Sequence, residues 1–213
     1  GRIMSVTVEE LITRLRRDPS DREAFSTLRK HYHRMADYAS LANLLEGWAS
    51  QNPDSNAAAD AFVEASKYAQ GLADPLRGFS LLERALQRSP THAEASDQLE
   101  ALVEQAKDYD RLVRLIQQRI QLLSKQNETT PALAMLHFRL AELWRHRFSR
   151  TDRAVYHYRK AFEIDSSMVA AIYAARELYR NEGNWRMAAT LCEQEVHAEQ
   201  DPARKAALLR ELA

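Results

Sequence analysis

The segment PALAMLHFRLAELWRHRFSRTDRAVYHYRKAFEID, residues 131–165, contains two stretches of helical spacing separated by a short polar turn. In its first half, apolar residues recur every three or four positions, as they do on one face of a helix. These residues are Leu136, Leu140, Leu143 and Trp144. The segment lies between two breaks, at Thr130-Pro131 and at Asp165-Ser166-Ser167. It therefore predicts a pair of helices.

Breaks of the same kind recur along the whole chain, at intervals of 34, 37, 41, 35 and 36 residues. Two helical segments fit into each interval, and no stretch of six or more residues alternates in the manner of a strand. A period near 34 with two helices per unit is typical of a helical repeat array. The breaks are Asp18-Pro19-Ser20, Asn52-Pro53-Asp54, Ser89-Pro90-Thr91, Thr130-Pro131, Asp165-Ser166-Ser167 and Asp201-Pro202.

The composition agrees with a wholly helical, globular chain. Only 5 glycines and 6 prolines occur in 213 residues, and 45% of the residues are hydrophobic. Lys and Arg number 30 and Asp and Glu number 30, which excludes a chain drawn to nucleic acid or membranes by overall charge alone. No apolar run is long enough for a transmembrane helix. The single Cys192 excludes an internal disulfide and suits a reducing compartment, so we expect a cytoplasmic protein.

Two segments resemble the tetratricopeptide repeat, a family of helix pairs. The turn NEGNWRMA, residues 181–188, is similar to the family's corner between helices, and RAVYHYRKAFEID, residues 153–165, is similar to its second helix. The matching positions are the corner Gly183, the aromatic Trp185, the small residues Ala154, Ala161 and Ala188, and the aromatic Tyr158.

The resemblance implies an all-α fold, a right-handed α-solenoid of stacked antiparallel helix pairs. It covers residues 1–213 as a single array of about five pairs, with repeats that begin near Arg22, Ala59, Ala93, Ala134 and Val169. A second helix at 7–17 and a first helix at 202–213 are partial repeats, and Thr7 with Glu10 predicts a capping box. Residues 1–3 are interpreted as a non-native extension before Met4.

The two ends of the array carry further expectations. The N-terminus has no signal-peptide pattern, because its apolar residues are interleaved with charged ones. A final helix at 202–213 would leave Ala206, Leu209 and Leu212 uncovered. We therefore expect a longer array or a covering partner, which includes self-association through the ends.

Candidate catalytic and metal-binding residues do not form known patterns. His31 and His33 are two residues apart and His137 and His146 nine apart, so neither pair shares a helix face. Cys192 falls at a core position of a repeat and has no well-placed base. No Gly-x-Gly loop occurs. We expect no enzyme, no metal and no cofactor.

The balanced total charge hides alternating blocks. Residues 37–110 hold 5 basic and 13 acidic residues, and residues 111–160 hold 11 basic and 3 acidic. In a solenoid, blocks of sequence become blocks of surface. Neutral patterning for solubility competes with a partner-binding role, and we favour partner binding.

We therefore predict a non-enzymatic protein–protein interaction module, a scaffold or adaptor that binds a partner segment in a concave groove. In the family that the chain resembles, first helices line this groove. Carried over, the partner-binding candidates are Lys30, His33, Arg34, Glu64, Lys67, Glu94, Asp97, Phe138, Arg139, Glu142, Arg145, His146, Tyr173 and Arg180. The partner is expected to be an acidic peptide or helical segment, and Glu142 is expected to hold Arg139 and Arg145 extended.

Two alternatives stay open. One is RNA binding by a half-a-tetratricopeptide-like array, through the basic block 111–160 with Trp144, Tyr156 and Tyr158 as stacking platforms. Nucleic acid is the less favoured partner because these aromatics lie at or beside core positions. The other alternative is self-assembly.

Overall fold

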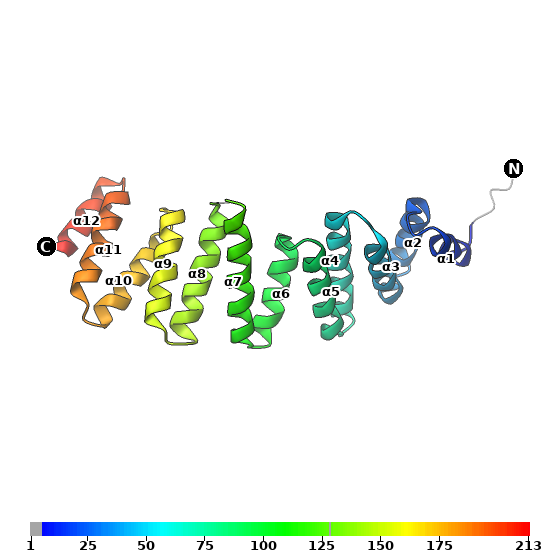
Figure 1. Ribbon diagram of the computed structural model, residues 1–213, viewed down its shortest axis with the longest axis horizontal. Helices are drawn as coiled ribbons and strands as arrows, with labels where there is room; N and C mark the ends of the chain where they lie inside the picture. Colours follow the sequence, from blue (N-terminus) through cyan, green and yellow to red (C-terminus); the bar gives the residue numbers. More distant parts are fainter. Residues whose placement is uncertain (1–5, 128) are drawn as a thin grey trace. The chain divides into compact units, whose positions relative to one another are not determined.

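The computed structural model of the chain describes residues 6–127 and 129–213. Within these residues twelve α-helices follow one another and no strand occurs (Figure 1). The first six are α1 (Val8–Arg17), α2 (Arg22–Arg34), α3 (Tyr38–Gln51), α4 (Ser55–Gly71), α5 (Pro75–Arg88) and α6 (Ala93–Gln105). The next six are α7 (Tyr109–Lys125), α8 (Pro131–His146), α9 (Thr151–Ile164), α10 (Val169–Asn181), α11 (Trp185–Ala198) and α12 (Pro202–Leu212). The predicted all-α class is confirmed, and the interpretation of residues 1–3 lies outside the described residues.

The chain divides into two compact units, Gly1–Ala106 and Lys107–Ala213. Helices α1 to α6 belong to the first unit and α7 to α12 to the second. Inside each unit every helix packs on the next one along the chain, and α4 also contacts α6. Each unit is thus a stack of helix pairs, while the prediction of one array across all 213 residues stays a prediction.

The register of the repeats follows the prediction closely. The first helices of the pairs begin at Arg22, Ser55, Ala93, Pro131 and Val169, each within four residues of the predicted start. Helices α4 and α8 begin early because Asp54 and Thr130 cap them by accepting backbone N–H groups of the first turn. The capping box of Thr7 and Glu10 at α1 is present.

The corner before four of the second helices repeats one local motif. A side chain at the N-cap accepts a backbone N–H from the following turn, and the residue before it has a positive φ. The caps are Asp37, Asp74, Asp108 and Asn184. The preceding residues are Ala36 (φ 52°), Ala73 (φ 59°), Lys107 (φ 58°) and Gly183 (φ 73°). Three corners therefore hold a side chain in a region that costs an L-residue about 1–2 kcal/mol.

We expect Ala73→Gly to raise the free energy of unfolding by about 0.5–1 kcal/mol, because relief of the left-handed backbone exceeds the entropy that glycine adds to the unfolded chain. Chemical denaturation measures the change. The control is Ala101→Gly on the exposed face of α6, where the same replacement should cost about 1 kcal/mol. If Ala73→Gly and Ala101→Gly lowered the free energy of unfolding equally, the backbone at Ala73 would not be strained.

Small and aromatic residues fill the positions between successive helices. Ala154, Tyr158 and Ala161 of α9 are fully buried, and Ala188 and Cys192 of α11 are nearly so. These are the positions that the tetratricopeptide resemblance assigns to the core. Because three of them are alanine, neighbouring helices can come close together at these points.

Three arginines of α5 form hydrogen bonds with α3 in the first unit. Arg77 and Arg84 donate to the carboxylate of Glu46, at 2.8 and 2.5 Å, and Arg88 donates to the backbone carbonyls of Ala49 and Asn52. Partial burial opposes ionisation of Glu46, but the two guanidinium groups outweigh it and hold the pKa of Glu46 below its usual value. These arginines are structural links between neighbouring repeats.

Ala161→Trp should destabilise the second unit, since Ala161 has no exposed surface and a large ring there must displace its neighbours. Overpacking of a tight core costs about 1–3 kcal/mol, sometimes more. A urea midpoint equal to that of the unmodified chain would show that the helices can separate at this point without cost.

Candidate partner-binding surface

The fourteen predicted site residues fall into two sets of seven, one in each unit. Lys30, His33, Arg34, Glu64, Lys67, Glu94 and Asp97 lie on α2, α4 and α6. Phe138, Arg139, Glu142, Arg145, His146, Tyr173 and Arg180 lie on α8 and α10. Each set comes from first helices of successive pairs, as the resemblance implies.

In the first unit, ion pairs join the first helices to one another. Arg29 of α2 lies 2.6 Å from Glu64 of α4, and Lys67 of α4 lies 2.6 Å from Glu94 of α6. Ion pairs with this much exposure contribute about 0–1 kcal/mol each. They engage Glu64 and Glu94, two of the three acidic candidates of this unit. The basic candidates Lys30 and Arg34 are exposed at the end of α2, as is His33.

In the second unit, Glu142 of α8 connects to α9. Its carboxylate accepts a hydrogen bond from the hydroxyl of the buried Tyr158, and its other oxygen lies 3.4 Å from Nε2 of His146. Burial and this hydrogen bond raise the pKa of Tyr158 above its usual range, and Arg145 also interacts with the hydroxyl. The ring of Phe138 meets Tyr158 edge-on. The sequence did not reveal these contacts, and the interpretation that Glu142 holds Arg139 and Arg145 stays a prediction.

Helix α10 presents an aromatic ring beside cations. Tyr173 is 51% exposed, and the guanidinium of Arg176 lies 5.4 Å from the centre of its ring. Arg180 pairs with Glu177 at 3.1 Å, one turn back on the same helix. Tyr173 is therefore an exposed aromatic ring with one guanidinium group close to it.

Arg176 was not predicted from the sequence, although it links three helices. It is 3% exposed and lies 3.0 Å from Glu195 of α11 and 2.7 Å from Glu211 of α12. Its Nη1 also lies 3.5 Å from Sγ of Cys192. Burial raises the pKa of the Cys192 thiol and that of Glu195. Cys192 is thus a protonated core thiol at neutral pH, which does not favour a nucleophile.

A pair of histidines lies between α8 and α9. Nδ1 of His137 is 3.0 Å from Nδ1 of His157, so one ring donates a hydrogen bond and the other accepts it. Burial lowers the pKa of both, that of His157 to about 4. The pair was missed because its members lie 20 residues apart on different helices. Among the described residues, no group of three or more possible ligands could hold a metal ion.

The aromatics required for RNA stacking are mostly covered. Tyr158 has no exposed surface and Trp144 is 7% exposed, whereas Tyr156 is 56% exposed. Stacking needs free ring faces. One accessible ring of three gives little support to the RNA alternative.

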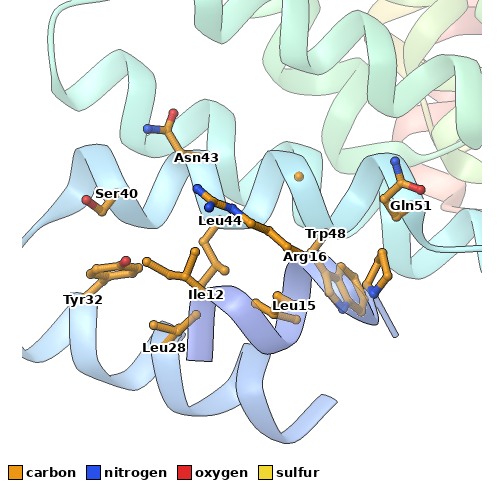
Figure 2. Close-up of a pocket in the computed structure, with 12 residues that line it drawn as sticks. Ile12, Leu15, Arg16, Leu28, Tyr32, Ser40, Asn43, Leu44, Trp48 and Gln51 are labelled. Carbon is orange, nitrogen blue, oxygen red and sulfur yellow. The ribbon is translucent and has the colours of Figure 1, made fainter. Parts of the chain in front are cut away.

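The first unit also contains an apolar cleft of about 750 Å³ between α1, α2 and α3, which the sequence did not reveal. Figure 2 shows side chains from the three helices converging on it. Its lining residues are Ile12, Leu15, Arg16, Pro19, Leu28, Tyr32, Ser40, Asn43, Leu44, Gly47, Trp48 and Gln51. We call it the α1–α3 cleft. None of its lining residues belongs to the fourteen candidates.

No protein-family model and no curated protein matches the chain. Among solved structures, that of the MamA protein is 15% identical, covers 84% of this chain and 92% of its own, and has a TM-score of 0.53. That of BtubC (BKLC) from P. vanneervenii is 13% identical, covers 90% and 86%, and has a TM-score of 0.51. Likeness at such low identity concerns the fold. With the register of its helix pairs, the chain has a tetratricopeptide-repeat-like helical repeat fold.

None of the described helices combines the length and the hydropathy needed to cross a membrane.

The histidine pair predicts an acid-sensitive second unit. Its rings stay neutral in the folded chain, whereas an unfolded histidine titrates near pH 6.5. The stability that the neutral pair contributes is complete above pH 6.5 and is lost as the pH falls toward 4, by about 2–3 kcal/mol.

Denaturation midpoints measured between pH 7 and 4 test this expectation. His157→Gln, which cannot take up a proton, should show a shallower decline than the unmodified chain. The exposed His197→Gln should follow the unmodified chain. If all three curves run parallel, the pair does not control acid stability.

Proposed function

We propose that the chain is a non-enzymatic protein–protein interaction module, a scaffold or adaptor segment, and that the first helices of its second unit bind an acidic segment of a partner protein. The observation that supports this proposal is that α8 and α10, two first helices of the second unit, each carry arginine and aromatic residues. The residues concerned are Phe138, Arg139, Arg145, Tyr173 and Arg180.

The charge balance of residues 111–160, which include α8 and α9, supports an acidic partner. Residues 111–160 contain 11 basic side chains and 3 acidic ones. Of the acidic side chains, Glu142 is engaged by Tyr158 and His146, and Asp152 lies 3.1 Å from Arg150. A surplus of positive charge therefore remains, and it would attract carboxylates and speed their association.

The binding mode would combine two contributions. Guanidinium groups pair with carboxylates through two parallel hydrogen bonds, which fixes the orientation of the bound segment. The exposed ring of Tyr173 would cover an apolar side chain of the same segment, as aromatic anchors do at interfaces. A short partner sequence that alternates acidic and apolar residues would satisfy both.

Fluorescence anisotropy with labelled 12-residue peptides tests the proposal. The probes are an Asp/Glu-rich peptide with one Phe or Leu and the same peptide with the acids replaced by amides. We expect the acidic peptide to bind and Arg139→Ala with Arg145→Ala to weaken it at least tenfold at low salt, about 1.4 kcal/mol.

The control is Arg114→Ala with Arg186→Ala, since both arginines are exposed on second helices of the same unit. This pair should change the affinity less than threefold. Arg84 and Arg88 would be poor controls because they hold α3 in place. Equal weakening by both double variants would mean that the basic block acts only as a diffuse charge.

Self-association through the ends stays a prediction, and mass measured as a function of concentration tests it. A reducing compartment such as the cytoplasm, inferred from the single cysteine, likewise stays part of the proposal.

A further inference from the structure

The α1–α3 cleft has more large apolar lining residues than two other hollows of the described residues. Seven of its lining side chains are large and apolar or aromatic, or proline: Ile12, Leu15, Pro19, Leu28, Tyr32, Leu44 and Trp48. In a hollow between α4 and α6 the one large apolar lining residue is Leu102, beside polar residues such as Lys67 and Gln98, and a smaller hollow near α11 has Phe162 and Val169 among residues such as Glu199. Apolar walls with a few polar groups are typical of binding sites.

Gly47 lies in the interior of α3, where glycine is among the least favourable residues. A Cβ atom built at Gly47 meets nothing within 4 Å. At Gly78 of α5, by contrast, a Cβ would lie 2.7 Å from Cγ of Gln70, so packing within the protein explains that glycine. Nothing in the described packing explains Gly47. Its missing side chain leaves the wall of the cleft open to a bound molecule.

The floor of the cleft is packed against the core of the first unit. The ring of Trp48 stacks on Phe25 at 4.7 Å, and Phe25 is buried. Leu28 has no exposed surface and belongs to the core cluster against which Ile12 and Leu15 pack. A preformed apolar surface loses little entropy on binding, which favours affinity.

Of the described residues that line the cleft, Arg16 alone carries a charge. Figure 2 shows it reaching from α1 toward α3. Its neighbour Arg14 is paired with Asp21 and Glu23, but no described carboxylate pairs with Arg16. A molecule in the cleft should therefore bring an anionic group to this side chain.

The length of the cleft indicates the kind of occupant. Its α3 wall runs from Ser40 to Gln51, which spans about 16 Å at the rise of an α-helix. Leu44 and Trp48 on this wall, with Ile12 on α1, provide separate apolar contacts along the cleft. An amphipathic helix supplies matching anchors at positions i, i+4 and i+7.

We propose that the α1–α3 cleft binds an amphipathic helical segment of a partner protein, with large apolar side chains on one face and a carboxylate that pairs with Arg16. This site is separate from the one proposed on the second unit. It lies on the first unit and involves none of the same residues.

The probes are capped helical peptides of about four turns. One carries Leu or Phe at i, i+4 and i+7 and a Glu one turn further on. A second has the Glu replaced by Lys, and a third has the same residues scrambled. Sodium laurate serves as a non-peptide amphiphile. Binding to the full chain is measured by calorimetry, and Trp48 emission is followed in a Trp144→Phe, Trp185→Phe background, because the chain has three tryptophans.

We expect the Glu peptide to bind at least tenfold more tightly than the scrambled peptide and to shift the Trp48 emission. Gly47→Met should weaken binding at least tenfold while the thermal midpoint stays equal or rises, because methionine favours the helix and fills empty space. Gly71→Met is the matched control: it also meets open space but does not line the cleft, so it should leave binding unchanged.

Arg16→Glu tests the charge independently of Gly47, and it also serves if Gly47→Met fails to fold. It should reverse the preference between the Glu and Lys peptides. The proposal is overturned if the scrambled peptide binds equally well, if Arg16→Glu leaves the preference unchanged, or if laurate binds and the Glu peptide does not. The last outcome would assign the cleft to small anionic amphiphiles.

Discussion

Each helix of this chain has an apolar stripe that a single partner cannot cover, and the rest of the structure depends on that constraint. In the pair α8 and α9, the buried Tyr158 contacts Phe138 and Glu142 of α8, but the outer stripes of the pair need the next pair. First and second helices alternate along each unit. It is this alternation that collects Arg139, Tyr173 and Arg180 on first helices and gives the candidate surfaces their composition.

The sequence predicts the features that depend on local spacing. Helix starts, the capping box at Thr7 and the buried small residues follow from patterns within about 34 residues, because backbone hydrogen bonds and caps are local. The corners are a partial exception. Gly183 marks one of them, whereas Ala36, Ala73 and Lys107 adopt the same backbone without glycine, so composition alone does not reveal them.

Contacts between helices were not predicted, since they depend on the rotation and tilt of each helix. His137 with His157, and Arg176 with Glu195 and Glu211, join residues 19 to 35 positions apart. The α1–α3 cleft has the same origin. Its apolar residues look like ordinary core positions in the sequence, and only the spacing between α1 and α3 leaves them partly uncovered.

The two bonds from Arg88 to the carbonyls of Ala49 and Asn52 make the end of α3 depend on a side chain from the following pair. In an array described by nearest-neighbour energies, such bonds belong to the coupling between units and not to the intrinsic stability of either one. If α5 unfolds, the carbonyls of Ala49 and Asn52 lose the hydrogen bonds from Arg88, and the last turn of α3 frays. Unfolding of α5 should therefore be followed by unfolding at the end of α3, toward the N-terminus. Amide hydrogen exchange at the end of α3 should accordingly follow that of α5.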